Sequence, residues 1–250
     1  MRRLVLAGLL CGCSATSSGP DLRILTASSL GEVFASLASV FASTRPGVDV
    51  ELVTAGSQTL AVQLRYGIEA DVLASADVET TTRLAADGLV ERGTPFATGQ
   101  LVLAVSEQAA SGLGLANLDT ARRIVLGAPD APVGRYADAL LTDAASRFGP
   151  DWRRAVEARV VSREPDARKV AAKISLGEAD AALVYATTVQ DLPGIQTVSL
   201  PAALGPTPVY VQATVVAAPH PELARAWQAA VTGPAGRRVL REHGFAPAAP

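Results

Sequence analysis

Cysteine is nearly absent from this chain. Cys11 and Cys13 are the only two among 250 residues, so the rest of the sequence can form no disulfide and must rely on an apolar core. Histidine is equally scarce, and its two residues do not have the spacing of metal ligands. These shortages exclude a disulfide scaffold and disfavour a histidine-based metal site.

Net positive charge and long apolar runs are also missing. The formal net charge is −2, so the sequence offers no broad positive field for nucleic acid. The apolar run 4–10 is far too short to cross a bilayer. With 49% hydrophobic and 18% charged residues over 250 positions, the composition predicts a globular protein with one large domain or two modest lobes.

The N-terminus carries the features of an export signal. Two arginines precede the apolar run 4–10, as in the core of a secretory signal peptide. The segment Leu10–Cys13 resembles a bacterial lipobox, which implies cleavage before Cys13 and attachment of lipid there. We therefore predict a signal peptide with a lipobox over 1–13 and a flexible tether over 14–21. The alternative is an ordinary signal peptide that is removed together with both cysteines.

Beyond the tether, the hydrophobic pattern alternates between strands and helices, which predicts an α/β protein with mostly parallel sheets flanked by helices. We expect strands at 22–26, 48–54, 72–75, 101–105, 124–127, 160–162, 181–185, 197–200 and 209–217. We expect helices at 30–43, 60–66, 78–87, 135–147, 152–158, 167–176, 186–191, 222–231 and 234–243.

Two segments have the character of crossings between lobes. Residues 96–100 precede a very apolar strand, and the proline-rich segment 206–208 precedes another. The sequence thus predicts a first lobe from 22–99 and 209–250 and a second lobe from 100–208, with the last two helices packed on the first lobe. Pockets are common between lobes, so we expect the ligand in that cleft.

Two strand-to-helix turns near the start of the predicted fold carry serines. One strand leads into Thr26–Ser29, and the next leads into Thr54–Thr59. The first N–H groups of a helix lack intrahelical partners and, together with the helix dipole, attract anions. Taken singly, each serine is better explained as an ordinary helix N-cap. The pair predicts a small oxyanion site only in combination with features further along the chain.

Three downstream features supply that combination. The segment 127–137 ends a strand, turns on two prolines and starts a helix near Arg135, where Gly134 permits a close approach of the backbone. Asp166 has the position of an N-cap before another helix. Tyr185 ends an apolar strand with a hydroxyl donor.

In this order and spacing, the segments resemble the periplasmic molybdate-binding proteins of ABC transporters. The resemblance extends from Leu22 to Phe245, over nearly the whole predicted mature chain. It implies a type II periplasmic-binding-protein fold, with two lobes and the ligand in the cleft between them. The matching segments are Thr26–Leu30, Gly56–Leu60 followed by Gln63 and Gly67, Asp71–Asp77, Pro132–Tyr136, Gly177–Asp180 with Tyr185, and Gly244–Phe245.

The resemblance implies five positions that contact the ligand. Ser29 and Ser57 are expected to donate hydrogen bonds from their hydroxyl and backbone groups, and Tyr185 from its phenol. Val133 and Ala167 are expected to donate through their backbone N–H groups, so their side chains should matter little. Three secondary candidates are Ser28, Arg135 and Arg168.

The secondary candidates have plainer alternatives. Ser28 stands where the family often has alanine, and its hydroxyl either adds a donor or faces solvent. Arg135 and Arg168 follow the expected backbone donors, where an arginine more often belongs to a solvated or salt-bridged surface. At segment 98–100 the family often has an asparagine that this sequence lacks. This difference affects the expected hinge and not the ligand site.

A site of neutral donors suits a tetrahedral dianion, which presents only hydrogen-bond acceptors. The predicted set contains no histidine, lysine or carboxylate, so it keeps its charge state across physiological pH. Cavity size is expected to select molybdate and tungstate over the smaller sulfate. Molybdate and tungstate are nearly the same size, so the sequence does not separate them.

The resemblance implies extracytoplasmic binding of molybdate, and of tungstate, for delivery to an ABC transporter permease and its ATPase. We expect a monomer without cofactor or enzymatic activity, with no nucleic-acid partner and with membrane contact only through a lipid anchor. One alternative is a receptor for another tetrahedral oxyanion, such as sulfate or thiosulfate. A serine hydrolase is a second alternative, although the sequence has no G-x-S-x-G turn.

Overall fold

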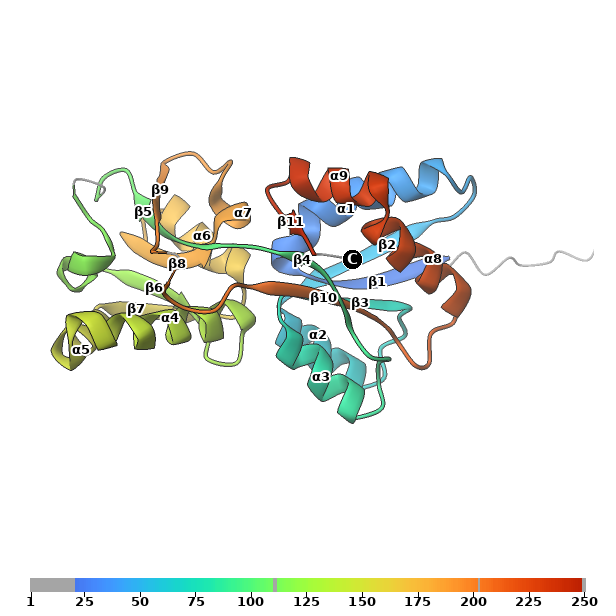
Figure 1. Ribbon diagram of the computed structural model, residues 1–250, viewed down its shortest axis with the longest axis horizontal. Coiled ribbons are helices and arrows are strands. Elements are labelled where there is room, and N and C mark those ends of the chain that lie inside the picture. The colour runs from blue at the N-terminus through green and yellow to red at the C-terminus, as the bar shows by residue number, and fades with distance from the viewer. Residues whose placement is uncertain (1–20, 110–111, 202, 249–250) are drawn as a thin grey trace, which may run out of the picture.

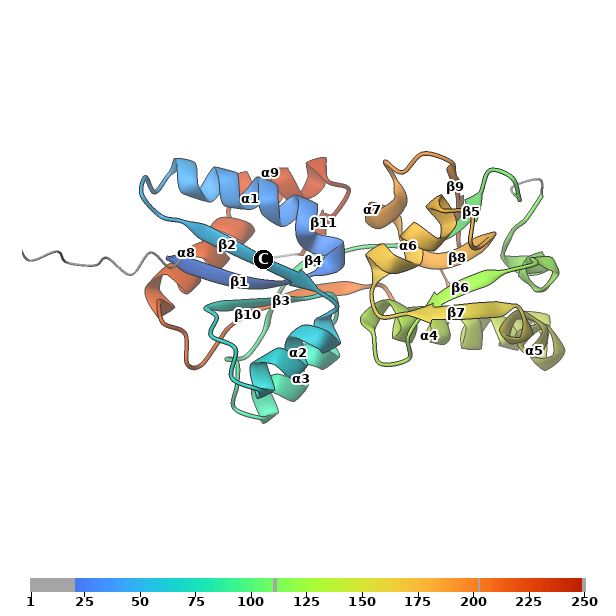
Figure 2. The same cartoon turned by 180° about the vertical axis from the view of Figure 1, so that it is seen from behind.

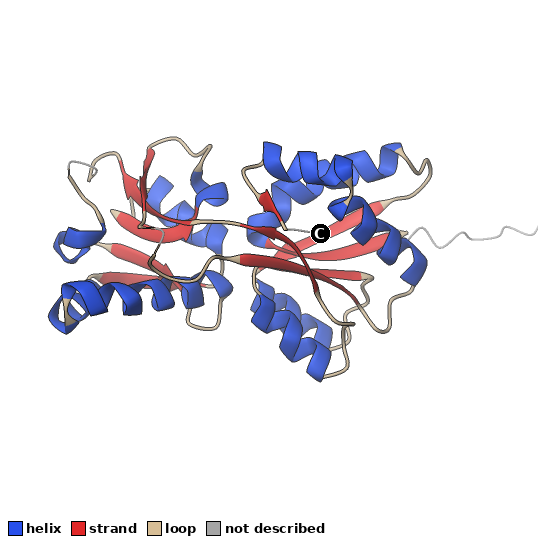
Figure 3. Ribbon diagram, in the orientation of Figure 1, coloured by secondary structure: helices blue, strands red, loops and turns tan. Residues whose placement is uncertain are grey.

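The computed structural model describes residues 21–109, 112–201 and 203–248. The predicted signal peptide, Cys13 and nearly all of the predicted tether lie outside these residues. Two sheets lie one after the other along the long axis of the molecule, and helices cover both faces of each (Figures 1 and 3). We call the six-stranded sheet with its helices the first lobe and the five-stranded sheet with its helices the second lobe.

The first lobe has the strand order β11-β4-β10-β3-β1-β2. Its strands are β1 (Leu22–Ala27), β2 (Val50–Ala55), β3 (Val72–Ser75), β4 (Thr94–Thr98), β10 (Val209–Thr214) and β11 (Ala246–Pro247). Its helices are the short 3₁₀ helix η1 (Ser28–Leu30), α1 (Gly31–Ser43), α2 (Ser57–Arg65), α3 (Val78–Ala86), α8 (Pro221–Thr232) and α9 (Pro234–Glu242). Helices α1, α8 and α9 lie on one side of the sheet, and α2 and α3 lie on the other (Figure 1).

Burial along β1 explains why both faces of this sheet are covered. Ile24 belongs to a core cluster with Phe34 and Trp227, whereas Leu25 belongs to a second cluster with Leu60. Successive side chains of a strand point to opposite faces, so a strand that is apolar at every position needs a helix layer on each side. The C-terminal helices α8 and α9 supply part of one layer by packing against α1.

The second lobe has the strand order β7-β6-β8-β5-β9. Its strands are β5 (Leu101–Ser106), β6 (Ile124–Gly127), β7 (Val160–Glu164), β8 (Ala181–Tyr185) and β9 (Ile195–Ser199). Its helices are the 3₁₀ helix η2 (Leu115–Thr120), α4 (Pro132–Phe148), α5 (Pro150–Ala158), α6 (Ala167–Ser175) and α7 (Ala186–Val189). In the described residues of both lobes, no helix is long and apolar enough to cross a membrane.

Both sheets are mixed, so the prediction of mostly parallel sheets was wrong. Strand β1 runs parallel to β2 and β3, and β6 runs parallel to β7 and β8. Strand β10 is antiparallel to β3 and β4, and β5 is antiparallel to β8 and β9. The reason is the route of the chain, since β5 and β10 each enter their lobe from the other one. Strands β5 and β10 therefore run away from the space between the lobes. The parallel strands run toward that space.

Two extended connections join the lobes, from β4 to β5 and from β9 to β10 (Figure 2). They are hydrogen-bonded to each other, because the Gly99 N–H donates to the Pro208 carbonyl at 3.0 Å. The second connection is also fixed to α4, since the N–H of Val209 donates to the Tyr136 hydroxyl at 3.1 Å. The crossings therefore form a two-stranded hinge that is tied to the start of α4.

Candidate functional site

A cavity lies between the two lobes, beyond the carboxyl ends of six strands, where ligands of open α/β sheets are usually bound. It encloses about 200 Å³ of empty space, part of it open to solvent. All five principal residues expected to contact a ligand line it, and so does Ser28. The complete lining is Ala27, Ser28, Ser29, Gly56, Ser57, Gln58, Ala76, Ala131, Pro132, Val133, Pro165, Asp166, Ala167 and Tyr185.

The serines of the first lobe do not act as helix caps. The N-cap positions are Ala27 and Gly56, and neither η1 nor α2 has a side-chain cap hydrogen bond. The plain capping alternative is therefore wrong for these serines. Ser57 is instead the first residue of α2, and its Oγ accepts a hydrogen bond from the Ala76 N–H at 3.1 Å. That bond occupies a lone pair of Ser57 Oγ and leaves its proton available to a ligand.

Two further hydroxyls at the cavity are buried without a partner. Among the described residues, Ser29 Oγ and the Tyr185 hydroxyl have no hydrogen-bond partner. A buried polar group in that state costs about 1–3 kcal/mol, so few are kept without a reason. Burial raises the pKa of Tyr185 well above its ordinary value of 10.0, with Tyr210 adding to the shift, so the phenol remains protonated and able to donate. An acceptor-only ligand would satisfy both hydroxyls.

The second lobe lines the cavity with residues from two helix starts. Val133 is the second residue of α4, and Ala167 is the first residue of α6. N–H groups in a first turn have no intrahelical acceptor. Arg135 is the first residue of α4 whose N–H has such an acceptor, and it donates to the Ala131 carbonyl at 3.0 Å. Helix α4 starts three residues earlier than predicted because Pro132 fits the first helical position.

The close turn at Gly134 positions the α4 donors. A Cβ atom added to Gly134 would lie 1.9 Å from the Ala128 carbonyl oxygen and 2.7 Å from that of Gly127. These are backbone atoms that cannot rotate away. The first turn of α4 therefore lies directly against the end of β6, in a position that only glycine at 134 allows.

One carboxylate borders the cavity, although none belongs to the predicted set of donors. Asp166 lines it from the second lobe and is 9% exposed. As predicted, Asp166 is an N-cap: its Oδ1 accepts from the Lys169 N–H at 3.0 Å, and its Oδ2 lies 3.7 Å from Lys169 Nζ. The charge of Asp166 is thus directed to its own helix, which reduces its repulsion of a bound anion.

The two arginines among the secondary candidates do not line this cavity. Arg135 pairs with the carboxylates of Asp77 and Glu79, and Arg168 pairs with Glu32 at 3.0 Å. The salt-bridged alternative therefore describes both. Their partners belong to the first lobe, so both ion pairs join the lobes.

Sequence reasoning missed Gln58, which also lines the cavity. Its Nε2 donates to the Pro165 carbonyl of the second lobe at 2.5 Å, while its Oε1 is buried without a partner among the described residues. Gln58 follows Ser57 in the turn already singled out, which was the available signal. Its partner across the cleft could not be read from the sequence.

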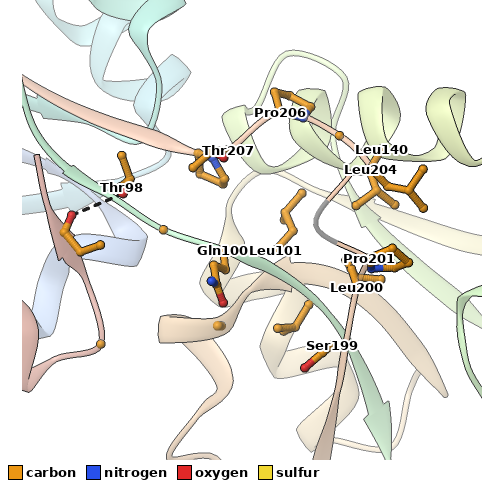
Figure 4. A pocket seen from close by; sticks show the side chains of 17 residues that line it. Thr98, Gln100, Leu101, Leu140, Ser199, Leu200, Pro201, Leu204, Pro206 and Thr207 are labelled. Carbon is orange, nitrogen blue, oxygen red and sulfur yellow. Dashed lines mark hydrogen bonds between the residues drawn. The ribbon is translucent and has the colours of Figure 1, made fainter.

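A larger cavity, with about 1340 Å³ of empty space, lies beside the hinge (Figure 4). Its lining includes Thr98 and Gln100 from one crossing and Pro206 and Thr207 from the other. The one helix start there is already paired, because the Ala186 N–H donates to the Gln100 carbonyl at 2.9 Å. In the described part of the chain, its lining does not bring together two helix starts as that of the smaller cavity does. Within the described residues, no group of histidine, cysteine or acidic side chains is arranged to hold a metal ion.

Comparisons with known proteins agree with this architecture. A family model described as bacterial extracellular solute-binding protein matches residues 22–246. The molybdate-binding protein ModA of Mycobacterium tuberculosis is 33% identical over 259 residues, which cover 97% of this chain and 94% of that protein.

Solved structures share the fold at lower identity. The periplasmic molybdate-binding protein of Azotobacter vinelandii has a TM-score of 0.77 and 22% identity, covering 92% of this chain and 99% of that one. The sulfate-binding protein SubI of Mycobacterium tuberculosis has a TM-score of 0.80 and 16% identity, covering 93% of this chain and 88% of that one. At these identities the structural likeness concerns the two-lobed fold alone.

Proposed function

Because this chain belongs to the family of bacterial extracellular solute-binding proteins, we propose that it binds molybdate outside the cytoplasm and delivers it to an ABC importer. One observation carries the proposal: serines of the first lobe and two helix starts of the second lobe line one cavity, where Ser29 Oγ and the Tyr185 hydroxyl have no hydrogen-bond partner among the described residues. A tetrahedral dianion presents only acceptors, and donors fixed by the backbone can replace its hydration shell.

The five proposed ligand contacts are Ser29, Ser57, Val133, Ala167 and Tyr185, with Ser28 as an additional donor. The likeness to the mycobacterial ModA, at 33% identity, favours molybdate. Tungstate is the second proposed ligand because it has nearly the same size and charge. Sulfate is the alternative ligand, supported by the fold shared with SubI, and cavity size would decide between them.

Donors from two lobes imply a cycle of opening and closure about the hinge. In the closed form the anion is held from both sides, and opening releases it to a transporter. The proposed partners are the membrane permease of an ABC transporter and its ATPase. A lipid at Cys13 would keep a monomeric receptor near that permease.

The alternative of a serine hydrolase has less support. A nucleophilic serine donates its proton to a base, usually a histidine. No histidine is among the residues that line the cavity, so the cavity offers Ser57 no such base. We propose a receptor without catalytic activity. Ester or phosphate-ester turnover that is lost in Ser57→Ala would contradict this.

The decisive experiment is titration calorimetry of the purified protein with molybdate, tungstate, sulfate and phosphate. We expect tight binding of molybdate and tungstate and no displacement of either by excess sulfate. Equal affinities for sulfate and molybdate would contradict selection by size. Absence of binding for all four anions would contradict the function itself.

A further inference from the structure

Arg135 of the second lobe is held by three side chains of the first lobe. Its guanidinium contacts the Asp77 carboxylate, its Nε lies 3.1 Å from Glu79 Oε2, and its Nη2 donates to Thr80 Oγ1 at 3.3 Å. Asp77, Glu79 and Thr80 all belong to the start of α3. These contacts cross the cleft, so an opening of the lobes would break them.

The Asp77 carboxylate is oriented by its own lobe before Arg135 reaches it. Its Oδ1 accepts from the Thr80 N–H and from Ser75 Oγ, each at 3.1 Å. Its Oδ2 is the atom that meets Arg135. The side chain of Asp77 is 6% exposed and that of Arg135 is 25% exposed. A charge pair this shielded from water, in fixed geometry, is stronger than an exposed one.

The other flank of the cleft provides a natural comparison. Arg168 and Glu32 also join the lobes at 3.0 Å, but their side chains are 46% and 74% exposed. Exposed pairs contribute little, because water and salt screen them and two long side chains lose freedom. The two flanks therefore have the same kind of contact in very different surroundings.

Arg135 also lies within the turn that holds the ligand donor and the hinge. Val133 precedes it by two residues and lines the anion cavity, whereas Arg135 does not line it. Tyr136 follows it and accepts from the N–H of Val209, the first residue of β10. The first turn of α4 thus contacts the cavity, the opposite lobe and the hinge.

We propose that Arg135 is a latch, a positioning residue that holds the lobes closed by pairing with Asp77 and so sets the rate of anion release. The latch rests on the proposed oxyanion-binding function but does not touch the anion. A contact made only in the closed form raises the closed fraction, and apparent affinity scales with that fraction. The factor is the same for every anion, so the latch changes affinity and release without changing selectivity.

The test compares Arg135→Gln with Arg168→Gln as the matched control on the exposed flank. Release of molybdate is followed by stopped flow, and dissociation constants for molybdate, tungstate and sulfate by calorimetry. We expect Arg135→Gln to speed release and raise every dissociation constant by about 10- to 100-fold, the scale of hydrogen bonds to charged groups. Arg168→Gln should change the release rate and the dissociation constants by less than about threefold.

A second variant protects the test against damage to the fold. Glu79→Gln removes one latch charge and leaves the Asp77 cap of α3 intact, so its effect should lie between those of the two arginine variants. Cooperative urea unfolding of each ligand-free variant, as in the wild type, would show that the variants fold. A wild-type release rate in Arg135→Gln, or an altered ratio of molybdate to sulfate affinity, would overturn the latch.

Failure of the proposed function is recognised separately. If the wild-type protein binds none of the anions, that function is wrong, and the latch is then judged from the radius of gyration by small-angle X-ray scattering. A larger radius for Arg135→Gln than for the wild type would support the latch. Equal radii would overturn it.

Discussion

The two halves of the anion cavity are built from different chemical groups. The first lobe contributes serine hydroxyls, from Ser28 and Ser29 in η1 and from Ser57 at the start of α2. The second lobe contributes the backbone at Val133 and Ala167, and one phenol. For the proposed contacts, identity of the side chain matters at the serines and at Tyr185, whereas placement of the backbone matters at Val133 and Ala167.

This difference explains where the sequence must be exact. In the first lobe a hydroxyl has to stand at a given position, and nothing else replaces it. At Val133 and Ala167 of the second lobe the residue that carries the donor can vary, but the residues that place the turn cannot. Gly134 is the clearest of these, since the Ala128 carbonyl occupies the space of its missing side chain. Substitutions that separate these two requirements test the comparison directly.

The largest effect is expected for Gly134→Ala. The added Cβ would meet the Ala128 carbonyl oxygen at 1.9 Å, so the first turn of α4 must shift and carry Val133, Arg135 and Tyr136 with it. We expect affinity for molybdate to fall by at least about 100-fold, through loss of more than one charge-assisted hydrogen bond. Overpacking should also lower the free energy of unfolding by about 1–3 kcal/mol. Calorimetry and urea unfolding measure the two effects.

Gly31→Ala is the matched control in the first lobe. Its Cβ would approach the flexible end of Arg168 at 3.2 Å, a group that can move aside. Binding within about threefold of the wild type is expected, on the scale of an exposed ion pair. Comparable losses in both variants would show that the tight turn of α4 has no special role.

The second prediction separates Ser57 from Ser29. Each change to alanine removes a hydroxyl donor, so each should weaken molybdate binding by about 1.5–3 kcal/mol. Only Ser57→Ala also leaves a protein group unpaired, because the Ala76 N–H loses its acceptor. We therefore expect Ser57→Ala to lower the free energy of unfolding of the ligand-free protein by about 1–3 kcal/mol. Ser29→Ala should change the free energy of unfolding by less than about 0.5 kcal/mol.

Ser39→Ala provides the control for this pair. Ser39 lies on α1, and its hydroxyl bonds to the Ala35 carbonyl in an exposed position away from the cavity. It should alter neither binding nor unfolding beyond about 0.5 kcal/mol. Wild-type affinity in both Ser29→Ala and Ser57→Ala would show that the anion binds elsewhere.

The third prediction removes a backbone donor without removing a side chain that matters. Ala167 is the first residue of α6, a position that accepts proline, and Asp166 before it is extended, with φ −157° and ψ 165°. Ala167→Pro should therefore fold normally but lose one N–H. We expect a loss of affinity of about 1.5 kcal/mol, measured by calorimetry. Ala167→Ser keeps the N–H and should bind like the wild type, and an equal loss in both variants would contradict a backbone donor.

The residues that line the cavity were predicted from the sequence more closely than the strands around it. Turn chemistry is local, so the serine turns and the Pro132–Tyr136 turn could be recognised from neighbouring residues, and the structure brings them to one cavity. Strands β3, β6 and β8 were predicted with their observed bounds because each is a short, fully buried apolar run.

The features that were missed depend on contacts between distant residues. Strand β4 (Thr94–Thr98) was predicted only as a crossing segment, because its pairing with β10 and β11 is made by residues more than 100 positions away. The mixed direction of both sheets follows from the same crossings. Arg135 was a secondary candidate because it follows Val133, with a salt-bridged surface as the favoured alternative, and only the folded chain identifies Asp77 as its partner.

The smallest effect is expected from pH. Apart from Asp166, the one titratable side chain that lines the cavity is Tyr185, and burial raises its pKa well above 10.0. No donor in either half should therefore change its charge between pH 6 and pH 9, and we expect the affinity for molybdate to change by less than about twofold over that range. Calorimetry at several pH values in one ionic strength measures this.

Stability should behave differently above that range. A tyrosine whose pKa is raised by folding contributes stability that is complete below its unfolded pKa of about 10 and is lost as pH rises through the folded value. The free energy of unfolding should therefore decline above about pH 10, and Tyr185→Phe should make that decline shallower.

An affinity that fell steeply between pH 6 and pH 9 would mean that a titrating group, rather than neutral hydroxyl and N–H donors, holds the anion.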